Sequence, residues 1–145
     1  MTPLNEIQKI SIAKRIDFIE LELKDLEEYE DLDLDTYSRN RKVRRDVERI
    51  SEDIANATID IGKILLAGED VELPETYRDI FKKLLQIKIV SAELAESLSN
   101  LVRLRNILAH QYLDIKWEMI KDFIIHGRND IKVFLTIVKQ LINKI

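Results

Sequence analysis

Apolar residues near the start of the chain recur at alternating steps of four and three, which is the spacing of one face of an α-helix. In the N-terminal segment this stripe consists of Ile12, Ile16, Ile19, Leu23 and Leu26. We expect Thr2 and Pro3 to begin the helix, as an N-cap residue followed by proline at the first helical position. The acidic stretch 27–35 interrupts the stripe and predicts a turn.

The same alternation is longest in a second helix, which is predicted to start near Asp35 and Thr36. Its stripe consists of Val43, Val47, Ile50, Ile54, Ala57, Ile61 and Ile64. A narrow stripe kept over three heptads is typical of a helix that packs along another long helix in a bundle. Gly68 and the acidic residues after it are expected to end this helix.

Further apolar patterns predict the rest of a bundle. Pro74 is expected to open a third helix, whose apolar residues are Ile80, Phe81, Leu84 and Leu85. Ser91 is a good N-cap for a fourth helix, which continues to Tyr112. A fifth starts near Asp114, and Gly127 should bend or break it before the amphipathic stretch 131–141. The pattern predicts an all-α fold, an antiparallel up-and-down bundle of about five helices in one domain, residues 1–145.

Composition agrees with this prediction, because only 3 of the 145 residues are glycine and 2 are proline, too few for an all-β fold. The chain has no cysteine, which excludes disulfides and thiolate metal sites. The N-terminus shows no signal-peptide pattern, and no apolar run approaches the roughly 20 residues of a membrane span. We therefore expect a cytoplasmic protein without a membrane partner.

The formal net charge of −4 does not favour nucleic acid binding, but the charge is unevenly distributed. One stretch is basic: Arg39, Arg41, Lys42, Arg44, Arg45 and Arg49. Such a cluster can neutralise several phosphates, so Arg41, Arg44 and Arg45 are candidate RNA contacts. The alternative is a solvated helix face whose basic residues pair with the acidic ones among them, Asp46, Glu48 and Glu52.

The fourth helix carries polar residues where its apolar stripe should continue. The spacing of Leu94, Leu98 and Leu101 leads to Arg105 and then to Tyr112. An arginine in an apolar seam costs stability unless a partner compensates its charge. A polar line runs beside the seam, formed by Ser99, Arg103, Asn106 and His110.

These residue types suit cleavage of RNA through its own 2′-hydroxyl. A histidine can take or give a proton near neutral pH, and an arginine can hold a phosphate and stabilise charge building on it. We predict that Arg105, His110 and Asn106 are catalytic, and that Arg103 is a candidate RNA contact. No metal or cofactor is expected, because His110 and His126 are the only histidines and neither has a tight acidic group beside it.

Arg105 and His110 are five residues apart, which on an ideal helix is a rotation of about 140°. One straight helix would not aim both side chains at the same phosphate. Fraying of the helix after Ala109 would help. A two-fold dimer would help more, because it lines one cleft with both copies of the helix end.

The run from Arg105 to Tyr112, Arg-Asn-Ile-Leu-Ala-His-Gln-Tyr, resembles the Arg-x4-His-x-Tyr motif of the HepT-like branch of the HEPN proteins. The segment Pro-Glu-Thr-Tyr-Arg-Asp-Ile-Phe at 74–81 is also of the kind this family carries, and the resemblance extends over essentially the whole chain. It implies a helical HEPN domain that acts as a metal-independent ribonuclease toxin. It also implies a homodimer, in which the motif arginine and histidine of both copies line one cleft.

The resemblance further implies a partner, a minimal nucleotidyltransferase that acts as the antitoxin. That partner transfers AMP from ATP to the motif tyrosine, here Tyr112, and silences the nuclease. AMP beside His110 would add negative charge and bulk where the RNA phosphate must sit. Two alternatives remain. One is a non-catalytic module that binds nucleotide or RNA as the dimeric partner of the nucleotidyltransferase, and the other is a structural helical protein whose motif is coincidental.

Overall fold

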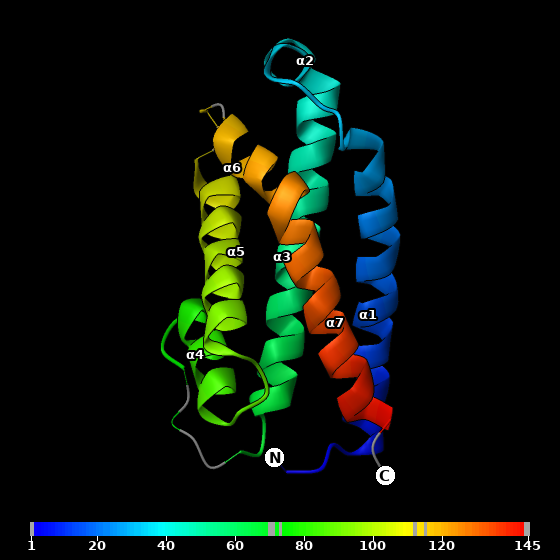
Figure 1. Ribbon diagram of the computed structural model, residues 1–145, viewed down its shortest axis with the longest axis vertical. Helices are drawn as coiled ribbons and strands as arrows, with labels where there is room; N and C mark the ends of the chain where they lie inside the picture. Colours follow the sequence, from blue (N-terminus) through cyan, green and yellow to red (C-terminus); the bar gives the residue numbers. More distant parts are fainter. Residues whose placement is uncertain (1, 70–71, 73, 112, 115, 144–145) are drawn as a thin grey trace.

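The four longest helices run alternately up and down the molecule (Figure 1). Their buried apolar side chains form one core. In chain order the elements of this computed structural model are α1 (Glu6–Leu26), the 3₁₀ turn η1 (Glu27–Tyr29), α2 (Leu34–Arg39), α3 (Arg41–Leu66), α4 (Tyr77–Gln86), α5 (Ala92–His110), α6 (Trp117–Asp122), the π-helical turn η2 (Phe123–Gly127) and α7 (Arg128–Asn143). The structure describes residues 2–69, 72, 74–111, 113–114 and 116–143. No strand occurs in these ranges, and the predicted all-α, up-and-down bundle is confirmed.

The start of α1 differs from the prediction, because a capping box outweighs the proline signal. Oδ1 of Asn5 accepts a hydrogen bond from the backbone N of Gln8 at 2.8 Å, and Oε1 of Gln8 accepts one from the backbone N of Asn5 at 2.9 Å. Two backbone donors that a helix start leaves unpaired are thereby satisfied. Thr2, the predicted cap, instead donates its backbone N–H to Glu69 Oε1 at 2.6 Å.

The predicted second helix is divided into α2 and α3 at Asn40. The backbone of Asn40 is extended (φ −98°, ψ 101°), and its side chain caps α3 by accepting from the backbone N of Val43 at 3.1 Å. Asp33 caps α2 in the same way, by accepting from the backbone N of Thr36 at 2.7 Å. That hydrogen bond lowers the pKa of the Asp33 carboxyl. Asn and Asp are strong N-cap residues, so both helix starts are set by local side-chain chemistry.

Three further boundaries correct the prediction in detail. The third helix begins at Tyr77 rather than at Pro74, and Leu85, one of its four apolar residues, is 37% exposed. The fifth begins at Trp117, three residues after Asp114. Gly127 does not break the helix, because the chain passes through η2 into α7. A Cβ at Gly127 would lie 2.5 Å from the ring of Phe123, so the π-helical turn needs glycine for space.

The predicted apolar stripes form one core. Every residue of the predicted α1 stripe is buried, as are the central residues of the α3 stripe and the predicted N-terminal stripe of α5, and Ser91 caps α5 as expected. None of the described helices combines the length and apolar character that a membrane span needs. No buried side-chain polar atom lacks a hydrogen bond in the part of the chain that the structure describes.

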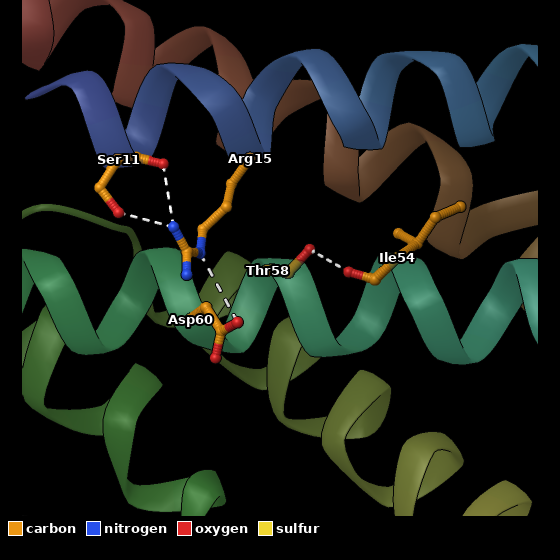
Figure 2. Close-up of polar contacts among 5 residues, drawn as sticks. All are labelled: Ser11, Arg15, Ile54, Thr58 and Asp60. Carbon is orange, nitrogen blue, oxygen red and sulfur yellow. Dashed lines mark hydrogen bonds and ion pairs between the residues drawn. The ribbon is translucent and has the colours of Figure 1, made fainter.

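Polar contacts fix how α1 sits against α3. Figure 2 shows Arg15 of α1 donating to the backbone oxygen and to Oγ of Ser11, at 3.1 and 2.6 Å. The same guanidinium pairs with Asp60 of α3 at 3.6 Å. The rotation of α1 about its own axis is therefore defined by a side chain as well as by the buried stripe.

Tyr37 of the short α2 is fully buried, and the sequence analysis did not identify it as core. Its hydroxyl donates to Glu48 of α3 and accepts from the backbone N of Lys116 at 3.4 Å, and its ring lies 5.4 Å from that of Trp117. Burial, reinforced by Glu48, raises its pKa. One side chain thus joins α2, α3 and the start of α6.

Replacing Tyr37 with phenylalanine should lower the free energy of unfolding by about 1–3 kcal/mol, because the Glu48 carboxylate loses its buried donor. The matched control is Tyr29→Phe, which also removes a hydroxyl that donates to a carboxylate, that of Asp46, but in a hydrogen bond exposed to solvent. Its cost should be below about 1 kcal/mol. Urea unfolding of the two variants measures the difference, and equal losses would contradict the central role given to Tyr37.

Glu22 of α1 should make stability depend on pH. Burial raises the pKa of its carboxyl, Asp53 and Asp25 raise it further, and Arg49 opposes them. A folded-state pKa above the unfolded value means that the carboxylate destabilises the fold at neutral pH, and that this effect disappears below the unfolded pKa of about 4.3. Glu22→Gln should therefore stabilise the protein at neutral pH and have no effect near about pH 3. Urea unfolding at both pH values tests this, and an equal effect at both would refute it.

Candidate functional site

Three helices hold the guanidinium group of Arg105. Its Nε donates to Oδ1 of Asn56 on α3 at 2.9 Å, and one terminal nitrogen donates to Oδ1 of Asn106 on α5 at 3.1 Å. Its central carbon lies 5.5 Å from the ring centre of Tyr77, the first residue of α4. Stacking on an aromatic ring and a hydrogen bond at Nε together fix the plane of the group.

No carboxylate pairs with Arg105 among the described residues. Its partner on α3 is the neutral amide of Asn56. The side chain is half-buried, so its positive charge is partly shielded from water but not neutralised. A cation in this state is well suited to bind an anion.

Tyr77 reaches Arg105 because α4 packs closely on α3. A Cβ at Gly62 of α3 would lie 2.6 Å from Cγ2 of Ile80, so glycine at this position allows the approach. Nζ of Lys63 lies 4.2 Å from the centre of the same Tyr77 ring. The ring therefore contacts two cations, and the second of them adds positive potential beside the Arg105 guanidinium.

His110 is the last residue of α5 and is exposed. The helix does not fray after Ala109, because the backbone N of Gln111 donates to the carbonyl of Ile107 at 2.8 Å. The rotation of about 140° between Arg105 and His110 therefore persists. Within one copy the two side chains leave α5 in different directions. Tyr112, the predicted site of modification, lies outside the described residues.

Arg103 lies on the His110 side of α5, away from Arg105, because seven residues are close to two full helical turns. It lines a groove of about 500 Å³ between α5 and η2, together with His126 and Asp130. Burial raises the pKa of Asp130, Asp122 raises it further, and His126 opposes them. Arg103 and Arg105 are not brought together in one copy.

A second groove, also of about 500 Å³, lies between the N-terminal half of α3 and the end of α5. Its lining residues are Lys42, Arg45, Asp46, Glu48, Arg49, Glu52 and Leu108. Leu108 is one helical turn beyond Arg105 on the same face of α5. Arg45 of the basic cluster is thereby placed beside the motif, whereas Arg41 is exposed at the first position of α3.

The carboxylates interspersed in the basic cluster do not pair with its arginines among the described residues. Asp46 and Glu48 accept hydrogen bonds from tyrosine hydroxyls. Arg49 pairs instead with Asp53 at 3.0 Å. Arg44 donates to the carbonyl of Ser38 at 3.0 Å, so it secures the end of α2. Arg39 likewise pairs with Asp35, four residues earlier, at 2.7 Å. Two arginines of the cluster are therefore paired along their own helices, as in the predicted alternative, but with Asp35 and Asp53 in place of the predicted Asp46, Glu48 and Glu52.

Asn56 and Tyr77 are the two site residues that the sequence analysis did not single out. Asn56 lies 49 positions before Arg105, so no spacing within one helix connects them. Tyr77 was part of the segment 74–81 that supported the family resemblance, but nothing local indicated its contact. In the described part of the chain no three His, Asp or Glu side chains lie close enough to share a metal ion.

Comparison with known proteins shows similarity to one family. The family model described as Ribonuclease HepT-like matches residues 19–138. The chain is 30% identical over 112 residues to the tRNA nuclease HepT of Aphanizomenon flos-aquae, covering 77% of this chain and 76% of that protein. It is 28% identical over 83 residues to the mRNA nuclease HepT of Shewanella oneidensis, covering 57% of this chain and 62% of that protein.

Solved structures share the fold. One is the tri-AMPylated HEPN toxin of Shewanella oneidensis in complex with the MNT antitoxin, at 22% identity and a TM-score of 0.80, covering 94% of this chain and 99% of that one. Another is YutE of Bacillus subtilis, described as a cytosolic protein of unknown function, at 22% identity and a TM-score of 0.75, covering 89% and 86%. Because the family model covers most of the sequence, the chain belongs to the HepT-like ribonuclease family.

Proposed function

We propose that this protein is a ribonuclease that cleaves RNA without a metal ion, with Arg105 as the phosphate clamp. The observation that carries the proposal is the Arg105 guanidinium, fixed by two amides and a ring but left without a carboxylate among the described residues. Family membership supports it, as do two similar proteins named as nucleases.

The reaction uses the 2′-hydroxyl of the RNA as nucleophile. Its oxygen forms a bond to the neighbouring phosphorus as the bond from phosphorus to the 5′-oxygen breaks, and the products are a cyclic phosphate and a 5′-hydroxyl. A histidine accepts the proton of the 2′-hydroxyl, and a proton is returned to the leaving 5′-oxygen. In the proposal His110 performs this proton transfer. Arg105 stabilises the negative charge that develops on the phosphate oxygens.

A shared cleft between two copies reconciles this chemistry with the geometry of α5. Within one copy the uninterrupted helix separates the directions of Arg105 and His110 by about 140°. A two-fold axis near the end of α5 would bring the His110 of one copy toward the Arg105 of the other. In this arrangement Asn106 positions Arg105, because its Oδ1 accepts a hydrogen bond from that guanidinium.

RNA would reach the cleft along the basic side of α3. The groove between α3 and the end of α5 is lined on the α3 side by the basic residues Arg45, Lys42 and Arg49. Its lining residue on α5 is Leu108, one helical turn from Arg105. Arg41, at the start of the same helix, and Arg103, on the His110 side of α5, are further candidates for phosphate contacts. Arg44 is a weaker candidate because it already donates to Ser38.

We also propose that a minimal nucleotidyltransferase is the antitoxin partner and that it attaches AMP to Tyr112. The support is the similar Shewanella oneidensis toxin, which is tri-AMPylated and bound to its MNT antitoxin. A negatively charged group two residues from His110 would occupy the place of the RNA phosphate and repel it. The second candidate function is a non-catalytic partner of the nucleotidyltransferase, which would keep this complex but have no cleavage to lose.

Substitution of His110 separates the two functions. His110→Ala should reduce RNA cleavage by about 10²–10⁴-fold in the presence of EDTA, the range expected when a general acid–base is removed. His126→Ala is the matched control, because it removes the only other histidine and should leave cleavage unchanged. Cleavage of a labelled RNA is followed on gels, and the product ends are identified by mass spectrometry. Absence of cleavage by the unmodified wild type would favour the non-catalytic partner.

The role of the positive charge on Arg105 can be tested without changing the shape of the site. Asn56→Asp gives Arg105 a carboxylate partner in place of an amide, so RNA cleavage and RNA affinity should fall by about tenfold, equivalent to about 1.4 kcal/mol. Asn143→Asp is the matched control, since it makes the same change of charge at an exposed position at the end of α7, beside residues of α1 rather than of α5. The fold should persist in both variants, as checked by circular dichroism. Unchanged cleavage by Asn56→Asp would show that the Arg105 charge is not used.

A further inference from the structure

Lys63 is an exposed lysine on a helix that is otherwise covered. All of α3 lies within the described residues, and beyond Arg49 every residue of it except Lys63 is buried or half-buried. The ammonium nitrogen of Lys63 lies 4.2 Å from the centre of the Tyr77 ring, and the central carbon of the Arg105 guanidinium lies 5.5 Å from the same centre. The sum of these distances limits the separation of the two charges to less than about 10 Å. One ring thus holds two cations together at the edge of the candidate site.

The charge of Lys63 is not neutralised within the part of the chain that the structure describes, since no ion pair there involves it. Asp60 lies three positions earlier on α3, a spacing at which a carboxylate and an ammonium group can pair. Figure 2 shows that Asp60 pairs instead with Arg15 of α1, at 3.6 Å. An aromatic ring attracts a cation but does not cancel its charge. Lys63 therefore keeps a positive charge that can bind an anion.

Lys63 lies on the same face of α3 as the residues beside the motif. It follows Asn56, the residue that binds Arg105, by seven positions. Arg45, which lines the groove beside Leu108, precedes Asn56 by eleven positions. These intervals are close to two and three full turns, so the three side chains leave α3 in nearly the same direction. At 1.5 Å per residue, Lys63 lies about 10 Å beyond Asn56 and Arg45 about 16 Å before it. Arg105 is therefore flanked by positive charge on both sides along α3.

We propose that Lys63 forms a second phosphate subsite, which binds the RNA phosphate next to the one that Arg105 holds, on the side away from Arg45. This inference rests on the proposed ribonuclease function and adds to it the path of the strand. The RNA lies along α3 and its phosphates contact Arg45, Arg105 and Lys63 in that order. Cations placed in this way follow a nucleic acid backbone without reading its bases.

The subsite contributes to binding rather than to the chemical step. Lys63 contacts a phosphate at which no bond forms or breaks, so its contribution is equal for the bound substrate and for the transition state. Loss of such a contact raises KM and leaves kcat unchanged, whereas His110→Ala should lower kcat. The sequence motif does not include Lys63, and its place beside Arg105 follows from the packing of α4 on α3.

Steady-state cleavage of a short RNA tests this division. Lys63→Met removes the charge but keeps an unbranched apolar side chain, and it should raise KM about fivefold in about 0.1 M salt without changing kcat. Lys63→Arg keeps the charge and can still stack on the Tyr77 ring, so it should behave like the wild type. Lys14→Met is the matched control, because Lys14 of α1 is also exposed and forms no ion pair among the described residues. It should change neither constant. An unchanged KM for Lys63→Met, or a lower kcat, would overturn the proposal.

The salt dependence of binding separates a phosphate contact from a merely structural role. Affinity is measured with an RNA whose 2′-hydroxyls are methylated, because it keeps every phosphate but lacks the nucleophile. Each phosphate contact contributes about 0.7–0.9 to the slope of log affinity against log salt concentration. Lys63→Met should reduce the slope by this amount, and Lys14→Met should not reduce it. A lysine that only supported the Tyr77 ring would leave the slope unchanged, so that result contradicts the subsite.

Replacement of single RNA phosphates by neutral methylphosphonates locates the subsite on the strand. The wild type should lose affinity when a phosphate that contacts a cation is made neutral. Lys63→Met should no longer respond to one position next to the cleaved bond, and Arg45→Met should no longer respond to a position on the other side of it. Insensitivity of both variants at the same position, or on the same side, would refute the proposed path.

The wild type distinguishes failure of this inference from failure of the proposed function. If the wild type neither binds nor cleaves RNA, the ribonuclease function fails and the subsite fails with it. If the wild type cleaves RNA and Lys63→Met keeps its KM, its salt slope and its response to every neutral phosphate, only the subsite is refuted.

Discussion

The long apolar stripe of α3 has to be covered on several sides, and the arrangement of the other helices depends on this requirement. α3 contacts α1, α2, α4, α5 and α6. Two hydroxyl groups on it, those of Ser51 and Thr58, are buried because each donates to the carbonyl oxygen four residues earlier, at 2.8 Å in both cases. Figure 2 shows the second of these bonds, from Thr58 to Ile54. Neither hydroxyl needs a partner on a neighbouring helix, so apolar residues can surround α3.

The candidate site is a consequence of the way α3 is covered. Gly62 allows α4 to come close, and α4 carries Tyr77 to the guanidinium of Arg105. Asn56, on the same helix as Gly62, accepts the hydrogen bond from Nε. At the other end of α3 the buried Tyr37 holds α2 and the start of α6 beside the end of α5. The position of one arginine is therefore determined by packing that extends over most of the bundle.

The sequence predicted the stripes because a repeated spacing of apolar residues is visible without any knowledge of the neighbours. It located the helix starts less well. The capping box of Asn5 prevails over the signal of Pro3, and the cap of Asn40 divides a helix that the apolar stripe predicted as one. The third helix begins at Tyr77, although Pro74 was the local signal for its start. The motif residues Arg105, Asn106 and His110 could be found because they are close together in sequence. Their partner Asn56 could not, because the contact joins residues 49 positions apart.

The contacts that fix the Arg105 guanidinium affect how tightly the site can bind an anion. An arginine free in solution has many rotamers, and fixing them when a ligand binds subtracts from the affinity, by roughly 0.5–1.5 kcal/mol for a long side chain. Here the fold itself fixes the guanidinium, through Asn56, Asn106 and the Tyr77 ring. The loss of freedom is incurred during folding, so it does not recur at each binding event. The site is preorganised, and its stability and its affinity are linked through one side chain.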